Sequence, residues 1–233
     1  MKETLSINEL KNKCVDLKKN VVHMIYKAQS GHPGGSLSVA DFMTACYWHA
    51  MDVDPKNPKW EDRDRFVLSK GHVCPAQYAA LAMKGFFPME ELETLRKEGS
   101  ILQGHPSSKH CPGIDISTGS LGQGLACAVG MALAAKLDGT CDEIMPLGDL
   151  PGKFKAFGFD VWEINGNDME EVVKALDEAM AAKNGNPKCI IGKTVKGNGV
   201  SYMENQVGWH GVAPNEEQYK QAMDELDRQY VEC

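Results

Sequence analysis

The feature that most constrains this chain is a glycine-rich segment, residues 115–124, that leads into a run of small and apolar residues. Gly119, Gly122 and Gly124 lie within the segment. Glycine lets a backbone turn tightly and approach a ligand closely. The run that follows, residues 125–136, predicts a helix. A loop of this kind suits an anion, because the first N–H groups of a helix have no internal partner.

The predicted helix has one face of small residues, because Gly122, Ala126, Gly130 and Ala134 recur every four positions. Positions with this spacing share a helix face, so another helix can approach closely. A loose glycine motif is weak evidence by itself. The pattern therefore fits a tightly packed core helix as well as a ligand-binding loop.

Composition limits the classes of protein to consider. The chain has 233 residues, of which 42% are hydrophobic, which suits one large domain or two small ones with a real core. The net charge of −7 argues against a broad basic surface for nucleic acid. No apolar run approaches the length of a membrane span, and no apolar signal segment is expected at the first residues. The eight cysteines form no Cys-x-x-Cys pair, which argues against a zinc site and favours a reducing, cytoplasmic location.

Strands are predicted to alternate with helices along the chain. The strands are expected at residues 65–69, 160–164 and 187–194. This alternation favours an α/β fold with a parallel sheet and helices on both faces. Three strands are few for an α/β domain of this size, so strands are missing. Helices are predicted from a capping box at Ser6 to a point before Gly31, from about Ser38, and over 76–83, 88–99, 153–157 and 169–180, with a last one after Asn215; the intervening residues 30–36 are predicted as a loop.

Four of the seven histidines lie beside glycine in predicted loops: His32, His72, His105 and His210. His72 directly follows the predicted strand 65–69, which is where ligands bind in open α/β sheets. Loop histidines can donate hydrogen bonds to phosphate or hydroxyl oxygens. One such histidine is more often a turn residue, but four favour convergence on one pocket. No carboxylate lies at metal-ligand spacing from them, so no metal site is predicted.

These motifs resemble those of transketolases. The resemblance is close and covers most of the chain. It is to the N-terminal, diphosphate-binding (PP) half of a split transketolase, whose second half is a separate polypeptide. The segments that carry it are, in order, residues 30–37 (SGHPGGSL), 68–72 (LSKGH), 104–106 (GHP), 113–124 (GIDISTGSLGQG), 164–168 (INGND), 191–197 (IGKTVKG) and 209–211 (WHG).

The resemblance implies a thiamine diphosphate-binding fold of the PP type, with residues 1–233 forming a single domain. The family binds thiamine diphosphate with Mg²⁺ or Ca²⁺ at a dimer interface. It moves a two-carbon ketol unit from a ketose phosphate to an aldose phosphate. The implied partner is a C-terminal, pyrimidine-binding subunit that supplies the activating glutamate, in a homodimer or heterotetramer. No nucleic acid or membrane partner is implied.

The resemblance also implies roles for individual residues. His72 would lie near the diphosphate, and His210 beside the diphosphate and the thiazolium. Backbone groups of the segment 119–121 would meet the aminopyrimidine. His32 and His105 would donate hydrogen bonds to oxygens of the donor sugar. The implied catalytic residues are thus His32, His105 and His210, and the implied cofactor-binding residues are His72, Gly119, Ser120, Leu121 and His210.

One departure from the family is large. The family carries Gly-Asp-Gly, followed some thirty residues later by Asn, and these hold the metal; the motif is absent here. We predict that a strand–helix–strand unit of at least about 30 residues is missing between residues 139 and 142. Residues 148–150 are no substitute. A genuine deletion, an engineered chain, or a sequence printed without part of the chain would each explain this. Without the metal, the nearest candidates for countercharge are Lys70, Lys193 and Lys196.

Two hypotheses therefore stay open at this point. The chain is an enzyme subunit that acts with its partner half, or it is a non-catalytic remnant or assembly module of the same fold. The sequence favours the first. Deoxyxylulose-phosphate synthase is less favoured, because that enzyme is normally one chain and its first loop resembles residues 31–36 less well.

Overall fold

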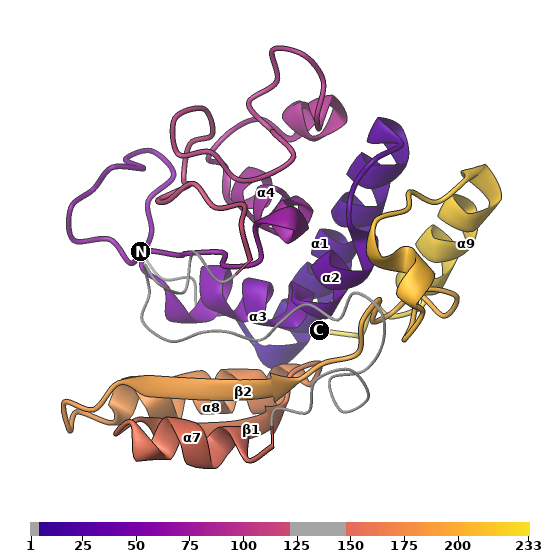
Figure 1. Cartoon of the computed structure of the whole chain (residues 1–233). Helices are drawn as coiled ribbons and strands as arrows, with labels where there is room; N and C mark the ends of the chain where they lie inside the picture. The colour runs from indigo at the N-terminus through magenta and orange to yellow at the C-terminus, as the bar shows by residue number, and fades with distance from the viewer. Residues whose placement is uncertain (1–4, 122–147) are drawn as a thin grey trace.

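The computed structural model describes residues 5–121 and 148–233 (Figure 1). The helix predicted over 125–136 and the junction predicted between 139 and 142 lie outside them. None of the described helices has the length and apolar character needed to cross a membrane. The elements, in chain order, are α1 (Ile7–Ala28), α2 (Pro33–Ser38), α3 (Ala40–Ala45), η1 (Cys46–Ala50), η2 (Gly71–Val73), α4 (Cys74–Lys84), η3 (Met89–Thr94), α7 (Leu150–Ala156), β1 (Asp160–Asn165), α8 (Met169–Ala181), β2 (Lys188–Lys193), η4 (Val207–His210) and α9 (Glu216–Asp227).

Helix α1 is the centre of the helical part of the molecule. It begins at the predicted capping box, in which Ser6 Oγ accepts a hydrogen bond from Glu9 N and the Glu9 carboxylate accepts one from Ser6 N at 2.7 Å. Its apolar residues, among them Leu10, Leu17 and Ile25, are fully buried. They face α3, α4 and α9, which all pack against α1. The predicted first helix is therefore confirmed.

The two strands form a parallel pair, as the alternation of elements predicted. β1 and β2 run in register from Asp160 beside Lys188 to Asn165 beside Lys193. Helix α8 connects them and packs on both strands, and α7 packs on β1. In Figure 1 this unit forms a layer below α1–α4. The last helix, α9, follows Asn215, as predicted, and Asn215 caps it with a second capping box.

The predicted strand at 65–69 is wrong, because its backbone groups bond to side chains instead of another strand. Phe66 N donates to Asp115 Oδ2 at 3.0 Å, and the Leu68 carbonyl accepts from Thr118 Oγ1 at 2.8 Å. Arg63 also contacts the Asp115 carboxylate. Among the described residues the segment has no strand partner. A short apolar run satisfied in this way looks like a strand in sequence alone.

Two other predictions are wrong. Residues 33–36, predicted as part of a loop, lie in α2, and Pro33 at its first turn suits a helix start because the first N–H groups have no internal partner. The helix predicted over 88–99 is only the short 3₁₀ helix η3. The chain turns back just after it at Arg96, whose φ is +61°. The helix predicted from about Ser38 begins as α3 and continues as the π-helix η1.

The sheet of β1 and β2 packs on α3 where the side-chain ring of Phe42 lies against Gly166 and Gly192. Phe42 of α3 lies so close to Gly192 of β2 that a Cβ there would overlap its ring, and a Cβ on Gly166 would lie 3.0 Å from the ring. Larger residues at these positions would push the sheet away from α3. The glycines therefore set the distance between the two layers.

We expect Gly192→Ala to lower the free energy of unfolding by roughly 1–3 kcal/mol, because the added methyl overpacks the contact with Phe42. Urea unfolding followed by circular dichroism measures the change. Gly208→Ala is the matched control, since a Cβ there meets nothing within 4 Å. Equal stability of the two variants would contradict this account of the docking.

Candidate functional site

The structure brings three of the four glycine-flanked histidines together from distant parts of the chain. His32 immediately precedes α2, His72 lies in η2, and His210 ends η4. The ring centroids of His32 and His72 are 4.9 Å apart, and each lies 5.3 Å from that of His210. We call these three residues the histidine cluster. Their roles stay predictions, but their convergence is a feature of the fold.

A close approach at Gly35 brings the first two histidines together. A Cβ at this position would lie 2.5 Å from Val73 Cγ1, closer than real contacts allow. Because Gly35 has no side chain, Val73 packs directly on the backbone of α2. The residue before Val73 is His72, so this contact brings the His72 ring beside His32.

The third histidine is brought in by the segment that follows β2. Gly197 N donates to the carbonyl of Gly34 at 2.9 Å. The Lys196 side chain lies against Gly34, with Cε 3.1 Å from the position that a Cβ would take there, and the Trp209 carbonyl is 3.0 Å from it. The segment is thus fastened to α2, and His210 follows next to His32.

The fourth histidine, His105, is exposed and makes no ring contact with the cluster among the described residues. It borders the same region, because its ring is 3.8 Å from the position of a Cβ on Gly119 and its charge lowers the pKa of His32 and of His72. Tyr78 holds its loop by donating to the His105 carbonyl at 3.1 Å.

The predicted aminopyrimidine contacts lie at the end of the first described range. Gly119 is half-buried beside His105, whereas Ser120 and Leu121 are exposed, the latter by 45%. The role of their backbone groups stays a prediction.

His32 and His72 are uncharged at neutral pH. Burial, together with the nearby His210, lowers the pKa of His32 to about 4. Burial, together with His32 and His210, lowers that of His72 to about 4 as well. A neutral imidazole has one donor and one acceptor nitrogen. These two histidines can therefore donate hydrogen bonds without adding positive charge.

Unsatisfied polar groups at the site point to a ligand with acceptor oxygens. Among the described residues, the Nδ1 atom of His32 and the Oγ atom of Ser69 are buried without a hydrogen-bond partner, and such groups are costly to leave unpaired. The next residue, Lys70, has no hydrogen-bond or ion-pair partner within residues 5–121 and 148–233. Burial lowers the pKa of Lys70 to about 8. The charge of Lys70 contributes to the lowered pKa of His72, so its ammonium lies near the cluster, and imidazole and ammonium donors together fit a diphosphate.

Arg96 is a residue of this region that the sequence reasoning missed. Its Nη1 atom donates to Ser30 Oγ at 2.8 Å, and Nε lies 3.2 Å from the position of a Cβ on Gly104. The guanidinium thus bridges the loops that carry the two Gly-His-Pro motifs, and its charge contributes to the lowered pKa of His32. No spacing in the sequence marks it, because it lies in an irregular turn.

The described residues contain no group of three or more histidine, cysteine or acidic side chains that could hold a metal ion. Asp149, in the segment judged no substitute for the family's metal motif, caps α7 by accepting from Gly152 N at 2.8 Å. The prediction that the family's metal ligands are absent is not tested by these residues.

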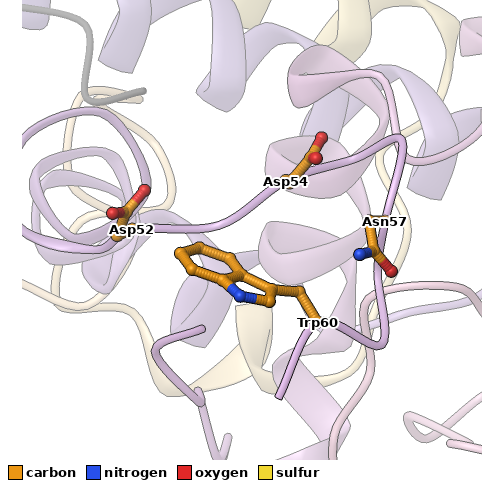
Figure 2. A pocket seen from close by; sticks show the side chains of 4 residues that line it. All are labelled: Asp52, Asp54, Asn57 and Trp60. Atoms are coloured by element: carbon orange, nitrogen blue, oxygen red, sulfur yellow. The ribbon is translucent and has the colours of Figure 1, made fainter. Parts of the chain in front are cut away.

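A hollow lies in the loop 51–64. It has a volume of about 390 Å³ and is lined by Asp52, Asp54, Asn57 and Trp60. Figure 2 shows the Trp60 indole beside the stretch of loop that carries the two aspartates. Asp54 Oδ1 accepts from the backbone N–H of Lys56 at 2.8 Å, so one of its oxygens already has a partner. We assign no chemistry to this hollow.

Comparison with known families identifies the fold. The family described as "Transketolase, thiamine diphosphate binding domain" matches residues 11–141 and 136–230. This chain belongs to that transketolase family. The resemblance found in the sequence is thus confirmed, and so is the parallel α/β fold of the PP type.

The relatives of this transketolase-family chain include subunits of similar length. It is 37% identical to the 6-deoxy-6-sulfo-D-fructose transketolase subunit SqwG of Clostridium sp., over 95% of this chain and 97% of the relative. It is also 37% identical to an apulose-4-phosphate transketolase subunit of Phocaeicola vulgatus, over 96% and 94%. These relatives indicate a transketolase-type transferase subunit.

Solved transketolases share the fold over nearly the whole chain. The enzyme from Campylobacter jejuni superposes with a TM-score of 0.86 at 28% identity, covering 96% of this chain and 43% of its own. The enzyme from Leishmania mexicana gives 0.82 at 29% identity, covering 97% and 42%. This transketolase-family chain therefore spans about two fifths of these structures.

We expect acid to destabilise the fold through the histidine cluster. The pKa of His72 falls from 6.5 to about 4 on folding, so between these values the unfolded chain binds more protons and the free energy of unfolding falls as the pH falls. The contribution of His72 is present above pH 6.5 and lost towards pH 4, by at most about 3 kcal/mol.

Urea unfolding between pH 4.5 and 7.5 measures this effect. His72→Gln should show a smaller loss of stability than the unsubstituted chain over that range, whereas His110→Gln, at an exposed position, should match the unsubstituted chain. Identical pH dependence in all three proteins would show that the cluster is not buried in the neutral form.

Proposed function

We propose that this chain is the diphosphate-binding subunit of a split transketolase, which transfers a two-carbon ketol unit together with a separate pyrimidine-binding subunit. The observation that carries the proposal is the convergence of three histidines, of which His32 and His72 are neutral, beside buried donor groups that have no partner among the described residues. Two relatives that it covers almost completely are named as transketolase subunits, which supports a partner on another polypeptide.

The donors suggest how the chain holds its cofactor. His72, His210 and two lysines, Lys70 and Lys196, would bind the diphosphate. Backbone groups of 119–121 would contact the aminopyrimidine. When bound, thiamine diphosphate supplies the nucleophilic carbon and the electron sink for ketol transfer. Of the three lysine candidates, the geometry favours Lys70 and Lys196, which adjoin the cluster, whereas Lys193 is exposed at the end of β2.

The substrate side of the site would be formed by His32 and His105. Both would donate hydrogen bonds to oxygens of the donor sugar, where negative charge grows during the reaction, and fixed donors stabilise such charge best. The low pKa of His32 keeps its imidazole neutral at pH 7. We propose a ketose phosphate as donor and an aldose phosphate as acceptor, because related subunits are named for anionic ketoses, a sulfosugar and a sugar phosphate.

The missing strand–helix–strand unit is part of the proposal. The family matches in two pieces that meet at residues 136–141. The alignment with the SqwG subunit spans 268 positions but covers only 95% of 233 residues, so roughly 47 positions of the alignment have no residue here. Both findings support a single domain over 1–233 with the junction between 139 and 142. The lysines would then replace the charge of the metal.

The alternative is a non-catalytic remnant or assembly module of the same fold. The absence of the Gly-Asp-Gly motif favours it. The unpaired donors at the histidine cluster favour the enzyme subunit instead. Buried polar groups without a partner cost stability, and a bound ligand would offset that cost.

Reconstitution tests the proposed function. The full chain, mixed with thiamine diphosphate and a pyrimidine-binding transketolase subunit, should transfer a ketol unit between sugar phosphates, measured by coupled assay. The chain alone should be inactive, since it lacks the activating glutamate. Absence of both turnover and cofactor binding with every partner half would support the remnant.

We further expect Lys70→Met to raise the dissociation constant of thiamine diphosphate about tenfold to a hundredfold, because a charge-assisted hydrogen bond is lost. Titration calorimetry of the reconstituted pair measures it, with the exposed Lys183→Met as control. Binding should persist in EDTA. If EDTA abolishes binding and Lys70→Met does not weaken it, a metal and not the lysine supplies the charge.

A further inference from the structure

A buried polar cluster lies behind the histidine site. It consists of Lys18 on α1, Asp41 on α3, Asn167 in the turn after β1, and Asn198 in the segment after β2. The side chains of Lys18 and Asp41 are only 6% and 9% exposed, and Lys18 Nζ lies 3.5 Å from Asp41 Oδ2. Four separate parts of the chain thus meet at one ion pair.

The two asparagines fasten the segment after β2 at two points. Asn167 Oδ1 accepts from Val195 N at 2.7 Å, while Asn167 Nδ2 donates to Asp41 Oδ2 at 3.1 Å. At the other end, Lys18 Nζ donates to Asn198 Oδ1 at 2.6 Å. Both attachments lead back to the same buried ion pair, so residues 195 and 198 are fixed relative to α1 and α3.

The residues between these two points belong to the site. Gly197 N donates to the Gly34 carbonyl, and Lys196 lies against Gly34 beside the histidine cluster. A lysine side chain is long and flexible, so the position of its ammonium group is well defined only when the backbone of the lysine is held in place. The polar cluster holds that backbone on both sides of Lys196.

Stability alone gives little reason for this arrangement. A buried ion pair contributes less than well-packed apolar side chains of the same volume would, because both charges lose their water. Burial by itself lowers the pKa of Lys18, but the nearby Cys14 and Asp41 outweigh it and the pKa is raised, so the ammonium stays charged. Such a pair is directional, which apolar packing is not.

We propose that Asn167 and Asn198 are positioning residues that hold Lys196 at the diphosphate, through the ion pair of Lys18 and Asp41. The inference rests on the proposed function, in which Lys196 binds the cofactor. None of the four residues of the polar cluster touches the cofactor itself.

Calorimetric titration of thiamine diphosphate into the reconstituted pair of subunits tests the proposal. Asn167→Ala and Asn198→Ala should each raise the dissociation constant about tenfold, which corresponds to one hydrogen bond. The matched control is Asn12→Ala. Asn12 also joins distant segments by two hydrogen bonds, with Nδ2 donating to the Val231 carbonyl and Oδ1 accepting from Val231 N, both at 2.8 Å.

A double-mutant cycle separates positioning from general loosening of the fold. In a Lys196→Met background, Asn167→Ala should weaken binding no further, because the residue it acts through is gone. Additive effects, or equal loss of affinity in Asn12→Ala, would overturn the proposal. Should Asn167→Ala fail to fold, Asn198→Ala takes its place in the same cycle.

The result also separates this inference from the proposed function. If the unsubstituted chain with its partner does not bind thiamine diphosphate, the proposed function fails. If it binds and both asparagine variants bind equally well, the function stands and the positioning role is wrong.

Discussion

The contact of Val73 with the bare backbone at Gly35 is the constraint on which the site depends. A methyl group there would lie 2.5 Å from Val73 Cγ1, so any other residue would separate α2 from η2. In the same helix, the Gly34 carbonyl accepts a hydrogen bond from Gly197 N, which fastens the segment after β2 to α2. Three histidines from residues 32 to 210 meet because two neighbouring glycines allow both approaches.

Crowding the three rings together has an electrostatic consequence that suits the proposed chemistry. Burial disfavours the charged imidazolium, and repulsion between neighbouring rings adds to the penalty, so the pKa values of His32 and His72 fall to about 4. The site then offers neutral, fixed donors, and positive charge is left to lysines such as Lys70. A diphosphate is recognised by such a division between directional donors and point charges.

The sequence predicted local structure well where residues close in sequence determine where a helix or strand begins. The capping box at Ser6 located the start of α1, the amphipathic pattern after Asn215 predicted α9, and the alternation of elements predicted the parallel pair of β1 and β2. It was wrong at 65–69, where the Asp115 and Thr118 side chains, fifty residues away, take the hydrogen bonds of a strand. Nothing in a short apolar run reveals such partners.

The sequence by itself determined the family, the fold class and which histidines to consider. The short motifs that contain adjacent glycine and histidine are local in the chain, and their order along it matches that of the family. Only the tertiary structure decided that His32, His72 and His210 meet while His105 stays at the edge. It alone placed the bridge at Arg96 and the polar cluster behind Lys196. The reason is physical: spacing along a chain fixes neighbours within one helix or strand, whereas contacts across more than a hundred residues depend on how the layers pack.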